Sequence, residues 1–222
     1  MFKTQWKWFP MALSITMTCG VIASTTAHAA SESDSDDAKK KDYPVTVEMF
    51  APAKGDHVGI GGRGWFVDLA IQYETPLENT GFNGFQITGP AGHNNIAPFP
   101  GTFSAGADEH VPGLVVLLST STVGAGSCQN LANLFNLTGV TDADAGNTEI
   151  WDTWLIGAPN FGVNTKSTIY VAVVDDLNQD GIYNDAPGAI TDINGDGNCD
   201  SRDLRALGLA SNIAKVRFYI NP

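Results

Sequence analysis

Basic residues are scarce in this chain of 222 residues. It contains 12 Lys and Arg against 24 Asp and Glu, and its formal net charge is −12 at pH 7. Such a charge disfavours nucleic acids and anionic membrane surfaces as partners, and it favours solubility and cation binding. A purely solvated acidic surface would give the same net charge, so the placement of the acids along the chain carries the argument.

Motifs for zinc binding and for common catalytic chemistry are absent. The sequence has no C-x-x-C, H-E-x-x-H or G-x-S-x-G motif, so it predicts neither a zinc site nor a hydrolase nucleophile elbow. The glycine run 59–64 matches a dinucleotide fingerprint as text, but a strand-like segment follows it where a pyrophosphate site needs a helix. The acids that could form the catalytic pair of a glycosidase are scattered along the sequence, which does not give the distances between their carboxyl groups. They are Glu74, Glu78, Asp108, Glu109 and Asp152. We therefore predict a protein without enzymatic activity.

Long apolar runs are lacking except near the N-terminus. Lys3 and Lys7 precede an apolar stretch over 9–23, and the small-x-small signature 27–29 follows it. This pattern is typical of an export signal, and no later segment is apolar enough to span a bilayer. We predict a signal peptide over residues 1–29 and a secreted, periplasmic or cell-surface protein. Removal of the signal peptide leaves 10 basic against 24 acidic residues, a net charge of −14.

Cysteine is also rare, with three in the chain. Cys19 lies in the leader, so Cys128 and Cys199 remain after cleavage and meet an oxidising compartment. A disulfide between them would close a loop of about 72 residues and contribute roughly 4 kcal/mol in the chain-entropy model. Two separate thiols are the alternative, and export favours the bridge.

The most specific motif lies near the C-terminus, over residues 192–203. Oxygen donors occupy positions 1, 3, 5 and 12 of this segment, and Gly197 at position 6 permits a sharp turn. Ca²⁺ takes six to eight oxygen ligands, which a twelve-residue loop supplies by curling around the ion. The expected ligands are four side chains and the backbone carbonyl of residue 198: Asp192, Asn194, Asp196, Asn198 and Asp203. A solvated Asp/Asn/Gly turn is the alternative.

This motif resembles the calcium loop of EF-hands and, more closely, that of dockerin modules. An EF-hand usually closes with Glu, whereas this loop closes with the shorter Asp203 and continues into Leu204, as a dockerin loop does. The resemblance covers roughly 20 residues and implies a short helix over 204–207. Dockerin repeats come as pairs of loop and helix that bind a protein partner, and a partner-docking module is therefore one alternative function.

A second acidic segment upstream, 176–185, repeats the D-x-N-x-D-G core. Its position 12 is Pro187, which has no side-chain oxygen, so Asn184 or Asp185 would have to complete the shell. The expected ligands are Asp176, Asn178, Asp180, Asn184 and Asp185. A tight Asx-type turn is the alternative.

The sequence of the mature chain predicts an all-β protein. Residues 30–42 are polar and charged, and we expect them to be disordered. From residue 43 onward, short apolar runs separated by Gly, Pro and Asn clusters are typical of strands. They lie at 45–50, 65–73, 85–88, 114–119, 150–156, 168–174 and 215–220, with helices at 129–137 and 204–207. We predict an antiparallel immunoglobulin-like sandwich over 43–222, with a calcium-loop insertion at 175–204.

These features together predict an exported, calcium-binding structural, adhesive or matrix protein. Ca²⁺ would stabilise the C-terminal loops, and the protein's partners outside the cell would be a protein or a polysaccharide. A carbohydrate-binding or carbohydrate-active protein is a further alternative, with Trp65, Trp151 and Trp154 as candidates for a sugar platform.

Overall fold

The computed structural model describes residues 42–62, 65–82, 111–121, 124–133, 137–143, 145–156 and 162–221. Within these ranges the chain forms mostly β-strands and a single α-helix, α1 (Ser201–Leu207). The leader 1–29, most of the polar lead and the expected strand at 85–88 lie outside the described residues. The β-rich class predicted from the sequence is confirmed.

The first sheet has four described strands, all antiparallel to their neighbours. Its order is β1-β3-β7-β6. The strands are β1 (Val45–Ala51), β3 (Trp65–Tyr73), β7 (Thr148–Ile156) and β6 (Leu137–Ala143).

The second sheet, in the order β2-β10-β8-β4, is mixed. The short β2 runs parallel to β10, whereas β10, β8 and β4 pair antiparallel. The strands are β2 (His57–Val58), β10 (Ala214–Ile220), β8 (Thr165–Val173) and β4 (Leu114–Leu118).

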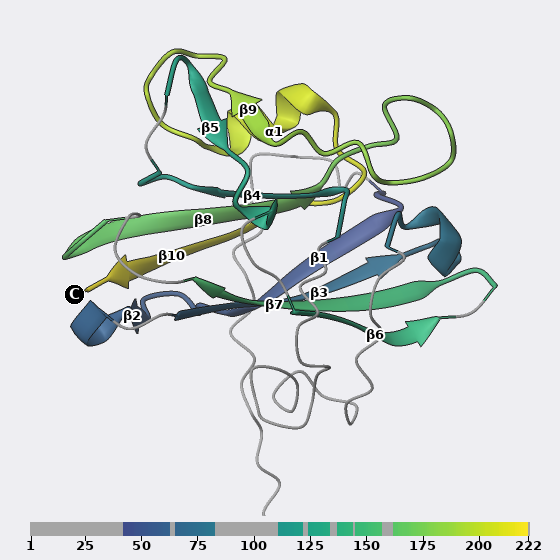
Figure 1. Ribbon diagram of the computed structural model, residues 1–222, viewed down its shortest axis with the longest axis horizontal. Coiled ribbons are helices and arrows are strands. Elements are labelled where there is room, and N and C mark those ends of the chain that lie inside the picture. Colours follow the sequence, from purple (N-terminus) through teal and green to yellow (C-terminus); the bar gives the residue numbers. More distant parts are fainter. Residues whose placement is uncertain are drawn as a thin grey trace, which may run out of the picture.

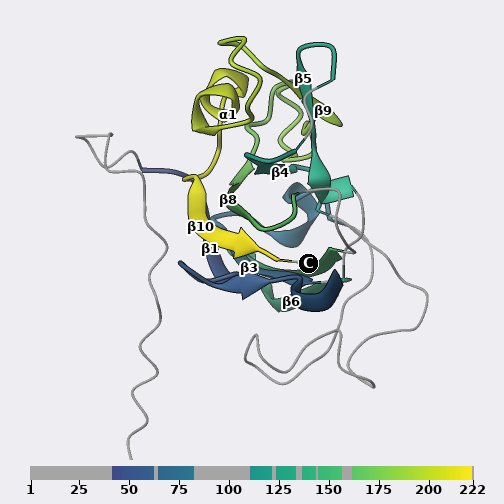
Figure 2. The same cartoon turned by 90° about the vertical axis from the view of Figure 1, so that its left-hand side faces the viewer.

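One hydrophobic core lies between the two sheets (Figures 1 and 2). In β1, Val45, Val47 and Met49 are buried while the residues between them are exposed, as expected for a strand with one covered face. Phe218 of the second sheet is fully buried against Trp65 of the first, with ring centroids 5.1 Å apart. Each such aliphatic or aromatic side chain stabilises the fold by about 1.5–3 kcal/mol.

A second core cluster covers part of the outer face of the second sheet. The strands β5 (Ser127–Gln129) and β9 (Ala189–Thr191) form a two-stranded sheet there, and α1 lies beside it (Figure 1). Tyr170 and Ala172 of β8 pack against this layer. Its other buried residues are Val115, Leu117, Cys128, Val174, Ile190, Cys199, Leu204, Leu209 and Ile213. The downstream loop is therefore attached to this layer through Cys199, and Val174 and Ala186 of the layer flank the upstream loop.

Asparagine side chains bond the edge strands β1 and β4. Val47 donates its N–H to Asn212 Oδ1 at 2.8 Å, and Asn212 Nδ2 donates back to the Val47 carbonyl at 2.9 Å. Asn130 does the same for β4, because it accepts the N–H of Val116 at 3.0 Å and donates to the Leu114 carbonyl at 2.9 Å. Each amide thus takes the hydrogen-bonding position of a further strand.

The strand predictions at 45–50, 65–73, 114–119, 150–156, 168–174 and 215–220 are confirmed within a few residues. The helix predicted at 204–207 is confirmed as the C-terminal half of α1. The helix predicted over 129–137 is wrong. Residues 127–129 form β5, 131–133 form a 3₁₀ turn and β6 starts at 137. The physical reason is that β5 pairs with β9 and Asn130 turns its side chain back onto β4.

Candidate functional site

The loop over 192–203 is held by its own acidic and amide side chains. Asp192 accepts the N–H of Gly195 through Oδ1 and that of Gly197 through Oδ2, both at 2.9 Å. Asn194 Oδ1 accepts the N–H of Asp196 at 2.9 Å. Asp196 Oδ1 in turn accepts the N–H of Asn198 at 2.8 Å. Gly197 adopts a positive φ of 77°, which favours glycine at this turn.

Asp203 at position 12 closes this loop from the first turn of α1. Its Oδ1 accepts the N–H of Ile193 at 3.0 Å and its Oδ2 accepts the N–H of Asp200 at 2.9 Å. Asp200 caps the helix in return, so the two acids form a reciprocal capping box. The Asp203 side chain is fully buried. A carboxylate has about four lone-pair sites, so each oxygen retains one beyond its N–H partner.

The upstream loop, 176–185, repeats three of these hydrogen bonds at the same positions, whereas Asp176 Oδ1 accepts the N–H of Asp180 at position 5 and Asp192 Oδ1 that of Gly195 at position 4. Asp176 Oδ2 accepts the N–H of Gly181 at 2.7 Å, as Asp192 does from Gly197. Asn178 Oδ1 accepts from Asp180, and Asp180 Oδ1 accepts from Ile182, both at 2.8 Å. The D-x-N-x-D-G core therefore gives one geometry in both loops.

Asp185 closes the upstream loop although it stands at position 10. Its Oδ2 accepts the N–H of Leu177 at 2.7 Å and that of Asn178 at 2.9 Å. Leu177 is at position 2, as is Ile193 of the downstream loop, whose N–H goes to Asp203. Asp185 thus takes the place that Pro187 cannot fill. Asn184 lies outside these side-chain bonds, since its Cβ faces the backbone of Gly81.

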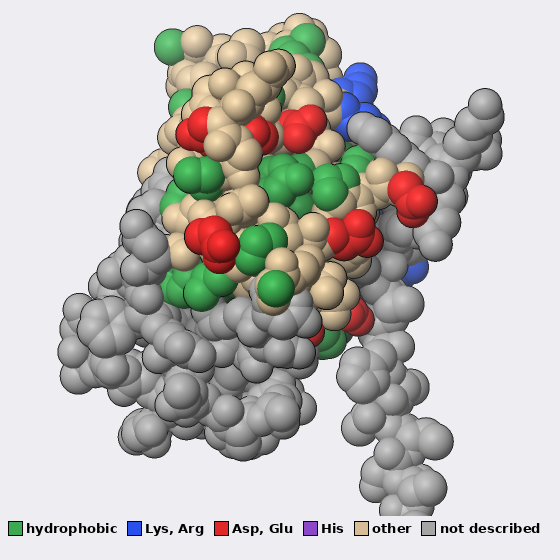
Figure 3. Space-filling model, turned by 90° about the vertical axis from the view of Figure 1, so that its right-hand side faces the viewer, with side chains coloured by type: hydrophobic (Ala, Val, Ile, Leu, Met, Phe, Trp, Pro, Cys, Tyr) green, Lys and Arg blue, Asp and Glu red, His purple; other side chains and the backbone are tan. Residues whose placement is uncertain are grey.

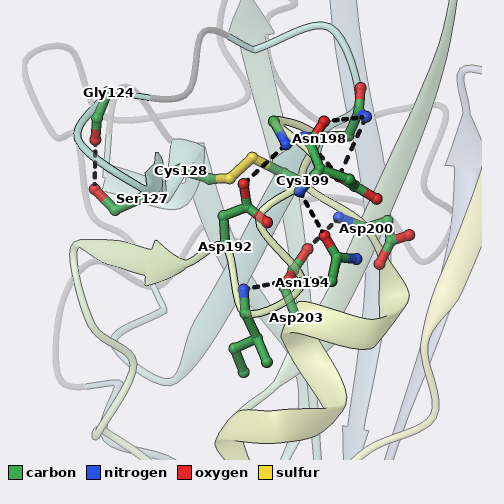
Figure 4. Close-up of a disulfide and its surroundings, with 12 residues drawn as sticks. Gly124, Ser127, Cys128, Asp192, Asn194, Asn198, Cys199, Asp200 and Asp203 are labelled. Carbon is green, nitrogen blue, oxygen red and sulfur yellow. Dashed lines mark hydrogen bonds between the residues drawn. A yellow bond between two sulfur atoms is a disulfide. The ribbon is translucent and has the colours of Figure 1, made fainter.

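A disulfide ties the downstream loop to the body of the protein. Cys199, at position 8, is bonded to Cys128 of β5, with their Cα atoms 6.1 Å apart (Figure 4). Both cysteines are fully buried in the second core cluster. The first residue of the loop is also fixed, because the Asp192 N–H donates to the carbonyl of Gly126 at 2.9 Å. The loop is thus held at its first residue, in its middle and at Asp203.

Charge at the downstream loop is partly balanced by Arg202. Its Nη2 lies 3.1 Å from Asp196 Oδ2 and 3.0 Å from Asp200 Oδ2. The backbone N–H of Asn198 is the main cause that lowers the pKa of Asp196, and Arg202 adds to it. The hydrogen bond and charge of Asp200 raise the pKa of Arg202. Asp196 is therefore an ionised, exposed oxygen donor at neutral pH.

The upstream loop lies at the opposite end of β8 from that strand's start, on the right in Figure 1. The face seen in Figure 3 shows several separate acidic side chains with hydrophobic ones between them.

Tyr183 of the upstream loop packs at a tilt on Tyr73, with ring centroids 5.9 Å apart. Burial raises the Tyr183 pKa, and the charges of Asp175, Asp176 and Glu74 raise it further.

The acids of neither loop gather into a metal-holding cluster by themselves. Among the described residues, no group of three His, Cys, Asp or Glu side chains is placed to hold a metal ion. The side-chain Nδ2 of Asn198 donates to the carbonyl and to Oδ1 of Asp196, and the ligand expected from this residue is its backbone carbonyl. A cation in either loop would need amide and main-chain oxygens in addition to the carboxylates.

The other candidates from the sequence are not brought together. Glu74 lines a cavity of about 280 Å³ with Glu149, Gln72 and Thr148. Asp108 and Glu109 lie outside the described residues, as does the side chain of Asp152. Trp65 is buried in the core and cannot serve as a sugar platform, and the side chains of Trp151 and Trp154 are not described.

Sequence reasoning overlooked three residues at the loops: Asp200, Arg202 and Asn130. An acid three residues before Asp203 is a capping-box signal that the motif contained. Arg202 has no such signal, because its pairing with Asp196 depends on the helix geometry. Asn130 joins β4 to the end of the upstream loop region by donating from Nδ2 to the Pro187 carbonyl at 3.1 Å.

Comparison with known proteins gives no relative. No family model, no curated protein and no solved structure matches this chain. Across the described ranges, no helix has the length and apolar character needed to cross a membrane.

Proposed function

We propose that this protein is an exported, non-enzymatic structural, adhesive or matrix component whose two C-terminal loops bind Ca²⁺. The equivalence of Asp185 and Asp203 carries the proposal. Two segments of different length reach the same arrangement of acids and amides, closed by a carboxylate on the N–H at position 2. Independent solvated turns would have no reason to share this closure.

The donor set fits Ca²⁺. All candidate side-chain ligands are oxygens of Asp or Asn, which a hard cation prefers. Asp192, Asn194, Asp196 and Asp203 would hold the ion in the downstream loop together with the carbonyl of Asn198. Asp176, Asn178, Asp180 and Asp185 would do so upstream. A buried carboxylate costs free energy unless charge balances it, and a divalent cation beside the buried Asp203 would supply that balance.

The role of calcium here is architectural. Cys199 of the downstream loop lies in the second core cluster and joins this loop to β5, whereas Tyr183 of the upstream loop packs against the first core cluster. Neutralising the clustered carboxylates would hold this layer against the second sheet. At 100 times its Kd, an ion that binds only the folded state contributes about 2.7 kcal/mol.

For the fold class, we propose an immunoglobulin-like sandwich over residues 43–222. Two four-stranded, largely antiparallel sheets with a common core support it. The partner-docking alternative has less support, because it needs an exposed apolar stripe on Leu204, Leu207 and Leu209. Leu204 and Leu209 are buried, and Leu207 packs against the same cluster.

Thermal unfolding of residues 30–222 in EDTA and in millimolar Ca²⁺ tests the proposal. We expect a calcium-dependent rise in Tm that the double variant Asp192→Asn/Asp196→Asn reduces and that adding Asp176→Asn/Asp180→Asn abolishes. The matched control Glu48→Gln/Glu78→Gln removes two acids elsewhere and should leave the rise intact. Identical melts in EDTA and calcium would reduce both loops to acidic turns.

A further inference from the structure

The two large sheets differ in the sign of their charged residues. The described strands of the first sheet contain five acids and no Lys or Arg: Glu48, Asp68, Asp142, Glu149 and Asp152. The strands of the second sheet contain no acid and three bases: Lys166, Lys215 and Arg217. In a chain with twice as many acids as bases, this concentration of positive charge on one sheet is notable.

The three bases point away from the core. In β10, Val216, Phe218 and Ile220 are buried in the core shared with the first sheet, so the alternate residues face outward. Arg217 and Lys166 are exposed, and Tyr219 is 38% exposed. The second core cluster covers the other end of this face, where the Lys215 ammonium lies 5.7 Å from the centre of the Tyr170 ring.

The uncovered end carries a row of side chains across three strands. Tyr219 of β10 pairs in register with His57 of β2 on one side and with Lys166 of β8 on the other. The rings of His57 and Tyr219 stack with centroids 4.9 Å apart and planes 17° apart. Arg217 stands two residues along β10, opposite Thr168. We define these residues as the basic patch: His57, Lys166, Arg217 and Tyr219.

Asp56 directly precedes His57 of the patch in the sequence. Asp56 borders β10, since its carbonyl accepts the Tyr219 N–H at 2.7 Å. Its carboxylate Oδ2, however, accepts the N–H of Ala53 at 2.8 Å within its own turn. One oxygen of the Asp56 carboxylate is thus engaged within this turn, and Lys166 and Arg217 are both exposed.

We propose that the basic patch binds an anionic polysaccharide, one whose sugar units carry carboxylate or sulfate groups. The guanidinium of Arg217 can hold either group through two parallel hydrogen bonds, and Lys166 adds a second charge. The stacked rings of Tyr219 and His57 offer a flat apolar surface with a polar edge, which suits the face of a sugar ring. An acidic protein would match the charges but has no particular use for these rings.

The negative charge of the rest of the molecule adds selectivity. It disfavours an anionic polymer over the acidic surfaces, and salt weakens the complex at the patch. The loops at 176–185 and 192–203 take no part, since β8 carries Lys166 at its start and leads into the upstream loop only after Val173. The inference therefore goes beyond the calcium proposal and does not depend on it.

The test uses the exported protein, purified after expression of the full chain. Its binding to dextran sulfate and to polygalacturonate is measured at low salt in EDTA, with uncharged dextran as the neutral control. We expect binding to at least one charged polymer, none to dextran, and a loss of about tenfold for Lys166→Gln or Arg217→Gln. Lys166→Arg should retain the affinity, and Tyr219→Ala should weaken binding without changing the net charge.

Arg205→Gln on α1 is the matched control, because it removes one exposed positive charge far from the patch and should leave binding unchanged. Equal melting temperatures of the variants in EDTA would show that folding is intact. No binding to either charged polymer overturns the proposal, as does binding that both patch variants leave unaltered. Self-association at low salt that needs Lys166 and Arg217, without polymer binding, would assign the patch to an acidic protein surface and would also overturn it.

Discussion

The carboxylate of Asp185 reaches back across the upstream loop to Leu177 and accepts its N–H at 2.7 Å. Asp203 makes the corresponding bond to Ile193 at 3.0 Å in the downstream loop. The closing acid comes at position 10 in one loop and at position 12 in the other. The upstream loop therefore closes without the residue that the twelve-position pattern requires.

Asp185→Asn should weaken Ca²⁺ binding to the upstream loop alone. Asn can still accept the N–H of Leu177, so the loop keeps its shape while it loses one negative charge. We expect a loss of about tenfold at one of two sites, or roughly 1.4 kcal/mol. Isothermal titration with Ca²⁺ measures it. Asp175→Asn, which removes a neighbouring acid that bonds to Asp176 N–H, serves as the control. Unaltered binding in Asp185→Asn would rule out closure by Asp185.

Removal of the disulfide should loosen the downstream loop as well as lower stability. Cys128 and Cys199 are 71 residues apart, so their bond restricts a long loop of the unfolded chain. Cys128→Ala/Cys199→Ala should therefore cost about 4 kcal/mol in urea unfolding. The double variant should also weaken Ca²⁺ binding at the loop that contains Cys199, whereas the upstream site keeps its affinity. Equal weakening of both sites would mean that the bond acts only through global stability.

Arg202 should compete with calcium for Asp196. Its guanidinium lies 3.1 Å from Asp196 Oδ2 and adds a positive charge beside the downstream loop. Arg202→Gln should therefore bind Ca²⁺ several-fold more tightly, and the difference should shrink as salt screens the charges. Arg205→Gln, three residues along the same helix, is the matched control. Weaker binding in Arg202→Gln would instead make this residue a support of the loop.

The sequence predicted the loops and most strands because both depend on local patterns. Alternating apolar residues in β1 and the D-x-N-x-D-G cores act over a few residues, and the same chemistry holds in the folded chain. The closure by Asp185 could be stated only as one of two choices with Asn184. Which of the two reaches Leu177 depends on how the chain turns before Pro187, and no short pattern encodes that turn.

Long-range contacts explain what was missed. The segment 129–137 has apolar spacing suitable for a helix, but β5 pairs with β9 about 60 residues away. Asn130 then bonds Val116 and Leu114, which lie in β4. The pairing of β10 with β2 and β8 likewise joins distant segments of the chain. The alignment of Tyr219 with His57 and Lys166 could therefore not be predicted from the sequence.

Tyr183 should make the protein less stable at strongly alkaline pH. Its pKa in the folded state is raised by burial and by nearby acids, above the ordinary value of about 10. Below that value the tyrosine is protonated in both states, and its contribution to stability is fully present. As the pH rises through the folded pKa, the unfolded state gains by ionising first, so stability falls. Tyrosinate absorbance should show a late titration component that Tyr183→Phe removes.

The two edge asparagines should differ in what their loss costs. Asn130 is 1% exposed, so Asn130→Ala would leave the N–H of Val116 and the carbonyl of Leu114 buried without a partner. We expect a loss of about 2–4 kcal/mol in urea unfolding. Asn212 is partly exposed, and water can replace it at Val47, so Asn212→Ala should cost about 1 kcal/mol.

The bond between Asn212 and the edge strand β1 gives a second prediction, which concerns self-association. Without Asn212, the N–H and carbonyl of Val47 on the edge strand β1 become available for pairing with another chain. Light scattering should therefore show concentration-dependent association in Asn212→Ala while the fold remains intact. Asn212→Asp, which keeps one oxygen acceptor and adds a charge at this edge, should stay monodisperse. Equal behaviour of Asn212→Ala and the unaltered protein would mean that other residues protect β1, and the amide would then serve stability alone.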